Sequence, residues 1–346
     1  MRVFSYQNKR RLKMALLILL LAALVLLLFC VCRFIFLQRY LVYSDDSVML
    51  DYSQDLVAQS DPTEQVWSSE DLEIVTEEAI AQVSATLDAP LETLSGNYIT
   101  TQMLLDMQSV TDALHQTEAL PDTLMLDLKS IYGNFYYSSG TSGAMTSSAD
   151  IPAIDSLIKS LSQEKDLYLI ARIASLSDTN FALAHQECGL PLRSGALWMS
   201  EDGCYWLDPA EELVQDYLVS IARELALMGF DEVVFDDFRI PDSKNIIYRG
   251  ELPREEAAAA AAEAIRSKLS DAPIRISFNS ADPAVASHSD RVYLVTTDGS
   301  AVAGLIDAVE DTVDDPSSQI VFLTPSRDTR FDNYSILRPL IEPREQ

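Results

Sequence analysis

The hydrophobic and polar positions of the chain change pattern several times, and the first change is the sharpest. An uncharged, leucine-rich run extends from Met14 to Cys32 and continues through residues 34–37. Nineteen helical residues at about 1.5 Å each span roughly the 30 Å hydrocarbon core of a bilayer. The run therefore predicts one membrane-spanning segment over residues 14–37.

The charges around this run predict its orientation. The first 39 residues contain seven Lys or Arg and no acid, and five of the seven precede the run. Because positively charged flanks stay in the cytoplasm, residues 1–13 predict a cytoplasmic tail and the rest of the chain an exterior part of a cell-membrane protein. A cleaved signal peptide is the alternative, which the length of the run and the lack of an A-x-A-like site after Cys32 disfavour.

Residues 38–93 have a lower density of apolar positions. The chain has no Lys or Arg from Tyr40 to Leu128, while acids recur throughout this stretch. One amphipathic helical pattern extends from Ser69 to Leu87, with apolar residues three and four positions apart. The pattern predicts an acidic extracytoplasmic stalk with one helix.

From residue 94 to residue 346, short apolar runs alternate with helical patterns. This alternation is typical of parallel strands joined by crossover helices, and about 250 residues is the usual size of a (β/α)8 barrel. The pattern therefore predicts an α/β fold, a TIM barrel. The expected strands are residues 96–99, 123–128, 167–173, 232–235, 274–278, 292–295 and 320–323, and the expected helices are residues 101–117, 151–162, 210–228, 254–270 and 300–311.

The eighth strand of this barrel has a short preceding connection. Residues 337–342 form a short apolar segment, but only thirteen residues separate it from the seventh strand, too few for a complete crossover helix. We therefore expect an incomplete or irregularly closed barrel.

Composition limits the partners. Beyond residue 39 the chain has 18 basic and 53 acidic residues, which excludes nucleic acid and anionic lipid as natural partners. Cys188 and Cys204 lie outside the predicted membrane segment, and the sequence leaves open whether they pair. The chain has no C-x-x-C or H-E-x-x-H motif and its three histidines are scattered, so we predict no metal site and no cofactor.

The polar residues that end the apolar runs are the candidates for chemistry, because the C-terminal ends of the strands form the active face of such barrels. Residues 229–241 are the most informative segment, since a buried apolar strand there ends in two adjacent carboxylates and an arginine. One of the two carboxylates must point into the barrel mouth, because strand side chains alternate; a structural ion pair with the arginine is the alternative. The strand-end candidates are Asp127, Lys129, Arg172, Asp236, Asp237, Arg239, Asn279 and Asp298.

The segment G-F-D-E-V-V-F-D-D-F-R-I-P at residues 229–241 resembles G-F-D-E-I-Q-F-D-Y-I-R-F-P, which is characteristic of glycosyl hydrolase barrels of bacterial envelope proteins. Residues 124–138, 169–178 and 206–217 resemble three further motifs of that family in the same order. The resemblance covers about residues 94–298.

The resemblance implies a relation to amylase-like glycoside hydrolases, in which the carboxylate that ends the fourth strand is the nucleophile. That residue would be Asp236, with Arg239 holding charge beside it. Glycoside hydrolysis needs one ionised carboxylate and one protonated carboxyl group. The candidates for the second acid are Asp237, Asp208, Asp127 and Asp298.

The chain departs from the family at the expected active face. Asn279 ends the fifth strand where amylase-type enzymes carry a glutamate proton donor, and residues 292–298 lack the S-P-M-x-Y-P ending. Trp198, Tyr205 and Trp206 could stack on sugar rings, or form a hydrophobic lid. The departures leave a barrel that binds glycan without cutting it as the alternative.

The sequence therefore predicts a membrane-anchored, extracytoplasmic glycoside hydrolase that acts on a cell-envelope or extracellular polysaccharide. The alternative is a catalytically degenerate barrel that serves as a glycan-binding or cell-envelope interaction protein. The predicted catalytic residues are Asp236, Asp237 and Asp208, and the predicted substrate-binding residues are Asp127, Lys129, Arg172, Trp206, Arg239, Asn279 and Asp298.

Overall fold

The computed structural model describes residues 41–44, 47–50, 90–116 and 120–342, and the chain divides into two compact units, residues 1–74 and 75–346. The described part of the first unit is an antiparallel pair of strands, β1 (Leu41–Ser44) and β2 (Ser47–Leu50). The predicted membrane segment and the predicted stalk helix lie outside the described residues. Within the ranges described, none of the helices is both long and apolar enough to cross a bilayer.

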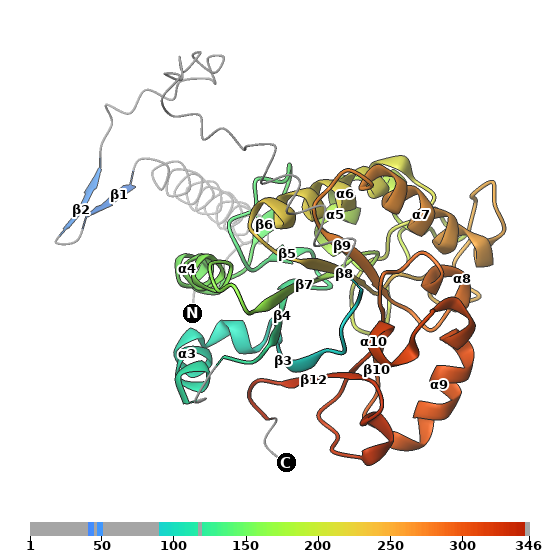
Figure 1. The fold of residues 1–346 in the computed structure, drawn as a ribbon. Coiled ribbons are helices and arrows are strands. Elements are labelled where there is room, and N and C mark those ends of the chain that lie inside the picture. Colours follow the sequence, from blue (N-terminus) through green and yellow to red (C-terminus); the bar gives the residue numbers. More distant parts are fainter. Residues whose placement is uncertain (1–40, 45–46, 51–89, 117–119, 343–346) are drawn as a thin grey trace, which may run out of the picture. The chain divides into compact units, whose positions relative to one another are not determined.

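The second unit contains a closed barrel of eight parallel strands (Figure 1). Strand β3 pairs with β12 on one side and with β4 on the other, and this pairing closes the ring. The predicted TIM-barrel fold is therefore confirmed. In sequence order the strands are β3 (Ser95–Ile99), β4 (Thr123–Lys129), β7 (Tyr168–Ala174), β8 (Glu232–Asp236), β9 (Arg275–Asn279), β10 (Val292–Val295), β11 (Ile320–Leu323) and β12 (Ser335–Pro339).

The expectation of an incomplete barrel is wrong because the ring closes, whereas the expected lack of a complete crossover helix before the last strand is confirmed. Strand β12 begins two residues earlier than predicted and pairs in parallel with both β11 and β3. The connection from β11 contains a short 3-10 helix, η5 (Thr329–Phe331), where a full crossover helix would not fit. The ring of Phe331 packs edge to face on Phe322 of β11, at 5.1 Å between ring centres, so this short turn covers the barrel wall.

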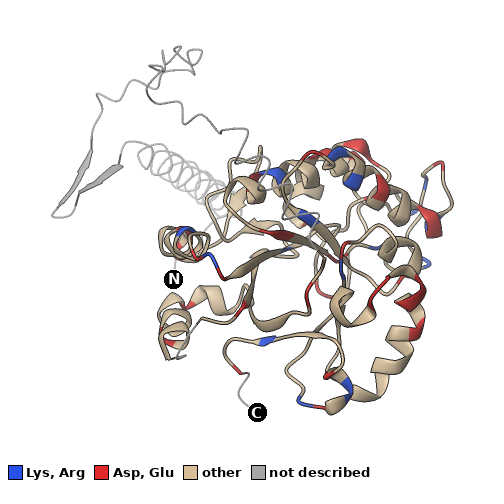
Figure 2. Cartoon of the chain, viewed as in Figure 1, with Lys and Arg blue, Asp and Glu red and all other residues tan. Residues whose placement is uncertain are grey.

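Five helices lie where the sequence predicted them: α3 (Met107–Gln116), α4 (Ile151–Leu161), α6 (Glu212–Leu227), α7 (Arg254–Lys268) and α9 (Val302–Val309). Acidic residues lie on the outer helices, including α7 and α9 (Figure 2). Helix α7 buries alanines of its polyalanine stretch, which brings its backbone close to the barrel. The shorter elements are β5 (Asn134–Phe135), β6 (Met145–Thr146), α5 (Thr179–Ala184), α8 (Pro283–Ala286), α10 (Pro316–Gln319), and the 3-10 helices η1 (Met103–Leu105), η2 (Gln186–Cys188), η3 (Gly299–Ala301) and η4 (Glu310–Thr312).

Cys188 and Cys204, whose pairing the sequence left open, are both buried free thiols. Cys188 ends η2 and Cys204 lies in the loop that precedes α6. Burial raises the pKa of the Cys188 thiol to about 11, so this thiol is protonated at neutral pH.

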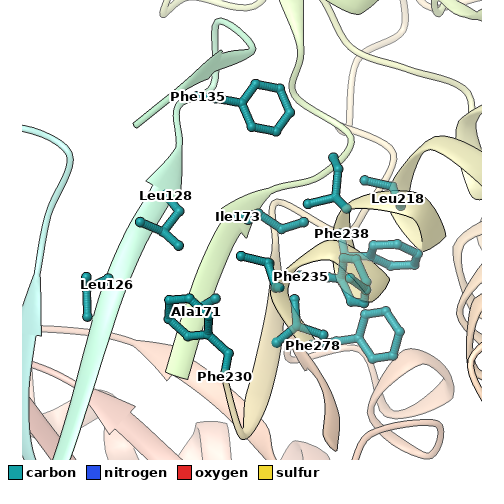
Figure 3. Packing of buried hydrophobic residues seen from close by; sticks show 14 of the residues in the cluster. Leu126, Leu128, Phe135, Ala171, Ile173, Leu218, Phe230, Phe235, Phe238 and Phe278 are labelled. Atoms are coloured by element: carbon teal, nitrogen blue, oxygen red, sulfur yellow. The ribbon is translucent and has the colours of Figure 1, made fainter. Parts of the chain in front are cut away.

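The core has two layers, because side chains alternate between the faces of each strand. Outside the barrel wall, Phe235, Phe238 and Phe278 pack together beneath the helices (Figure 3), with 5.4 Å between the rings of Phe235 and Phe278 and 4.6 Å between those of Phe238 and Phe278. Two of these rings flank the acidic pair in sequence and anchor its backbone from both sides. A separate cluster fills the barrel interior and includes Met125 of β4, Ile170 of β7 and Val234 of β8.

The interior cluster fixes the position of the candidate chemistry. Asp127, Arg172 and Asp236 each lie two residues after a member of that cluster, so they face the same interior nearer the C-terminal ends of the strands. At the opposite end, Arg291 Nη1 lies 2.7 Å from Glu232 Oε2, and both side chains are buried. The charged residues thus occupy the two ends of the barrel and apolar residues occupy its middle.

We expect Gly96→Ala to destabilise the protein, because a Cβ at this position of β3 would overlap the backbone carbonyl of Thr123 in β4. This pair of strands closes the barrel, so relief requires a shift of paired backbone. Unfolding by urea should show a loss of about 1–3 kcal/mol. Gly304→Ala is the matched control, since open space surrounds this glycine of α9 and the exchange should stabilise the helix by about 0.5–1 kcal/mol. Equal midpoints for the two variants would contradict the close approach of β3 and β4.

Candidate active site

Asp236 ends strand β8 and is surrounded by donors. Its Oδ1 accepts hydrogen bonds from Asn279 Nδ2 at 2.6 Å and from the backbone N–H of Asp237 at 2.9 Å. Its Oδ2 lies 3.7 Å from Nε of Arg172. The side chain remains 26% exposed. Two hydrogen bonds and one ion pair thus hold a carboxyl group that solvent or a ligand can reach.

Arg172 of β7 joins Asp236 to a second carboxylate, Asp127 of β4. Its Nε and Nη2 donate to the two oxygens of Asp127, each at 2.6 Å. Burial alone would lower the pKa of Arg172, but the charges of Asp127 and Asp236 outweigh it and raise that pKa, so the guanidinium stays charged. Burial raises the pKa of Asp127, and Arg172 opposes this shift.

Tyr98 of β3 belongs to the same group, and the sequence analysis missed it. Its ring packs against the cluster in the barrel interior. Burial raises the pKa of its hydroxyl, and the charges of Arg172 and Asp127 act on it in opposite directions, which places it beside that ion pair. Tyr98 lies next to the C-terminal end of β3, as Asp127 and Arg172 lie near the C-terminal ends of β4 and β7. This position in the strand is the sequence signal that identifies Tyr98.

Asp237 follows the end of β8 and is the one non-glycine residue with a positive φ, at 52°, in the part of the chain that the structure describes. Ser177 Oγ donates to its Oδ2 at 2.7 Å. Burial raises the pKa of Asp237, and the negative charge of Asp236 raises it further, while the bond from Ser177 and the charges of Arg239 and Arg172 oppose the rise. The two adjacent carboxyl groups therefore differ in their surroundings, since two donors and a cation contact Asp236, while the pKa of the Asp237 carboxyl group is raised.

The sequence analysis considered an ion pair between Arg239 and the acidic pair. In the structure Arg239 contacts an aromatic ring. Its guanidinium lies over the ring of Trp206, 5.3 Å from the ring centre, and Arg172 is the cation beside Asp236. Trp206 is 5% exposed. The prediction that Trp206 binds substrate by stacking is therefore corrected, because its ring is buried and supports Arg239.

Lys129 also departs from its predicted role of substrate binding. Its Nζ lies 2.8 Å from Asp178 Oδ2, and neither side chain has exposed surface. Nζ also donates to the backbone oxygen of Ala174, and Tyr217 donates its hydroxyl to Asp178. The register of β4 against β7 shifts between Asp127 and Lys129, so the lysine leaves the interior face that Asp127 occupies. We therefore assign Lys129 to a buried structural ion pair.

Two further predicted residues serve as local caps. Asp208 precedes α6, is nearly buried, and accepts a hydrogen bond from the backbone of Ala210; burial raises its pKa. Asp298 is exposed at the start of η3, where hydrogen bonds from Ser300 lower its pKa. The contacts of these two carboxylates are with their own loops, so we leave both out of the group around Asp236.

The geometry thus assembles Tyr98, Asp127, Arg172, Asp236 and Asn279 in the barrel mouth, with Asp237 beside them. A carboxyl group held by two donors and a cation, and a neighbouring carboxyl group with a raised pKa, provide the two acids that displacement at a sugar carbon requires. All but Tyr98 were predicted from the sequence.

Comparison with known proteins yields one family match. Residues 96–314, more than half of the chain, match the model of a family described as “putative glycosyl hydrolase domain”. None of the curated proteins matches the sequence.

Three of the solved structures that match this chain have low sequence identity to it. A hypothetical protein from Ruminiclostridium thermocellum ATCC 27405 has 23% identity and a TM-score of 0.45, and the match covers 53% of this chain and 96% of that one. An α-galactosidase from Geobacillus stearothermophilus has 14% identity and a TM-score of 0.50, covering 72% of this chain and 39% of that one. The glycoside hydrolase domain of PelA from Pseudomonas aeruginosa has 15% identity and a TM-score of 0.43, and the match covers 72% of this chain and 95% of that one. The likeness to the galactosidase is one of fold, and this chain spans well under half of that enzyme.

We expect Lys129→Met to lower the free energy of unfolding by about 3–5 kcal/mol, because it leaves the Asp178 carboxylate buried without its cation. Urea unfolding measures this loss. Lys159→Met is the control, since this lysine lies exposed on α4 and the same exchange there should change stability by less than about 0.5 kcal/mol. Similar midpoints for both variants would contradict a structural role for Lys129.

Proposed function

Because this chain belongs to the family of putative glycosyl hydrolase domains, we propose that it is a membrane-anchored glycoside hydrolase that cleaves a cell-envelope or extracellular polysaccharide at Asp236. The observation that carries this proposal is the contrast between the two adjacent carboxyl groups. Two hydrogen-bond donors and the Arg172 cation surround Asp236, while burial and the neighbouring charge raise the pKa of Asp237.

In the proposed reaction, Asp236 attacks the anomeric carbon and Asp237 protonates the departing glycosidic oxygen. The bond from the anomeric carbon to the leaving oxygen breaks as the bond to the Asp236 carboxylate forms. Asp237, then ionised, takes a proton from a water molecule whose oxygen attacks the anomeric carbon, and the bond from that carbon to Asp236 breaks as the sugar leaves. A nucleophilic Asp236 implies retention of the anomeric configuration.

Arg172 and Asn279 have supporting roles in this scheme. Asn279 holds Oδ1 of Asp236 at 2.6 Å, and the Arg172 cation stays near Oδ2. Both fix the carboxylate in place before substrate arrives, so little reorganisation is required in the transition state. Asp127 in turn orients Arg172 through two hydrogen bonds.

We further propose that the barrel faces the exterior and is tethered by residues 14–37. The support is the apolar run and the seven Lys or Arg around it. A tethered enzyme meets glycans within reach of the membrane surface, so an envelope or extracellular polysaccharide is the substrate class we propose. The acidic exterior part disfavours nucleic acid as a partner.

A second candidate function is glycan binding or interaction within the cell envelope without cleavage. Asn279 favours it, because an amide ends β9 and bonds to Asp236 where the amylase-like relatives implied by the sequence carry a proton donor. Turnover by the unaltered protein separates the two functions, since binding without release of reducing ends would support the second.

We expect Asp236→Asn to abolish hydrolysis while leaving glycan binding measurable, because an amide of the same shape cannot attack the anomeric carbon. Release of reducing ends from a panel of envelope polysaccharides should fall at least about a hundredfold. Asp307→Asn, the same exchange on the exposed face of α9, is the control and should keep full activity. Unchanged turnover in Asp236→Asn would end the nucleophile assignment.

The pH profile should report the proton on Asp237. An acid catalyst must be protonated, so kcat/KM falls as pH rises through its pKa, and burial places that alkaline limb above the ordinary value of about 3.9 for aspartate. Asp237→Asn should lower kcat about 10²–10⁴-fold on natural glycans. The loss should be much smaller on nitrophenyl glycosides, whose leaving group needs no proton. An equal loss on both substrates would show that Asp237 is not the acid.

A further inference from the structure

The segment that follows β7 holds the acidic pair at two points. The backbone N–H of Ser175 donates to the carbonyl oxygen of Asp236 at 2.9 Å. Two residues later, Ser177 Oγ donates to Asp237 Oδ2 at 2.7 Å. Ser177 is completely buried. One short segment thus fixes the backbone of the first acidic residue and the carboxyl group of the second.

The backbone of Ser177 is itself held on its other side. Ser177 forms an antiparallel bridge with Trp206. The neighbouring hydrogen bonds run from Leu207 N to the oxygen of Leu176 at 2.7 Å, and from Asp178 N to the oxygen of Tyr205 at 3.0 Å. The backbone that carries the Ser177 hydroxyl is therefore fixed before substrate binds. Little conformational entropy is lost at this residue on binding.

Asp237 needs such a partner because the strand no longer sets its direction. In a regular strand its side chain would point to the face opposite Asp236. Its left-handed backbone, at φ 52°, breaks that alternation, and the Arg239 N–H closes a tight turn onto its carbonyl oxygen at 3.0 Å. Aspartate tolerates this region better than most residues. The Ser177 hydroxyl then supplies the orientation that the strand does not.

We propose that Ser177 is a positioning residue, whose hydroxyl makes Oδ2 of Asp237 the accepting oxygen and leaves Oδ1 to carry the proton for the leaving group. The inference rests on the proposed function. A protonated carboxyl group has one accepting oxygen and one O–H. The proton on Oδ1 passes to the glycosidic oxygen as its bond to the anomeric carbon breaks, and Asp237 is left ionised.

The charged groups around Asp237 determine what removal of the hydroxyl would do. Burial and Asp236 of β8 raise the pKa of Asp237, whereas the Ser177 bond, Arg239 of the same loop and Arg172 of β7 lower it. Ser177→Ala removes a donor that favours the ionised form, so the pKa of Asp237 should rise further. The alkaline limb of kcat/KM should then move to higher pH, while kcat falls because the acid is less well oriented.

The test compares Ser177→Ala with Ser175→Ala in the full-length protein. Ser175 is equally buried, but its hydroxyl donates to the oxygen of Ile173, and the alanine keeps the backbone N–H that holds Asp236. We expect Ser177→Ala to lower kcat on natural glycans about tenfold, with a smaller loss on nitrophenyl glycosides. Ser175→Ala should leave the alkaline limb in place. If Ser177→Ala does not fold, Ser177→Cys fills the site with a slightly larger side chain and a weaker donor, and gives the same readouts.

A carbon NMR titration of the Asp237 carboxyl group separates this inference from the proposed function. A higher titration midpoint in Ser177→Ala than in Ser175→Ala supports the inference. If Ser177→Ala is active but leaves both the Asp237 titration midpoint and the alkaline limb of kcat/KM unchanged, the role of Ser177 is overturned and the proposed function is not. A protein that titrates as expected but hydrolyses no glycan would overturn the proposed function and, with it, the catalytic purpose of the contact.

Discussion

The interaction on which the candidate site depends is the buried contact of Arg172 with two carboxylates. Asp127 accepts both of its hydrogen bonds at 2.6 Å, and Asp236 lies 3.7 Å away. Two unit charges at about 4 Å interact by about 4 kcal/mol at the effective dielectric constant of a protein surface. Without the guanidinium, the two acids in the barrel mouth would repel each other and one would take up a proton. The guanidinium offsets this repulsion, while burial and the charge of Asp236 raise the pKa of Asp237.

Two irregularities in otherwise regular strands determine which charged groups lie in this mouth. The register shift after Asp127 takes Lys129 out of the interior and into a buried pair with Asp178, so the lysine does not neutralise the mouth. The positive φ of Asp237 turns a second carboxyl group away from its regular direction. Proteins often break local regularity at functional sites and compensate nearby, and here Ser177 and the buried phenylalanines on both sides of the pair provide the compensation.

Much of this arrangement follows from strand periodicity. The barrel, the positions of its strands and the grouping of Asp127, Arg172 and Asp236 all come from short apolar runs that end in polar residues. What the sequence could not provide depends on three-dimensional details. A one-residue register shift moves Lys129 out of the interior, and Tyr98 reaches the charged group from within the apolar end of β3. The chain reaches β12, which closes the barrel, through a short 3-10 helix, and an element of this length produces no helical periodicity in the sequence. The other differences from the predicted site concern residues in loops. Arg239 lies over the ring of Trp206, and Asp208 and Asp298 accept hydrogen bonds from backbone N–H groups of their own loops.

The most direct test of a nucleophilic Asp236 is to trap the intermediate it would form. A panel of 2-deoxy-2-fluoro aryl glycosides, which slow the release of a glycosyl-enzyme, would be incubated with the protein and the labelled peptide identified by mass spectrometry. A nucleophilic Asp236 held by Arg172 and Asn279 predicts inactivation with a single glycosyl label on Asp236. Inactivation with the label on Asp127, Asp237 or any other residue would contradict it.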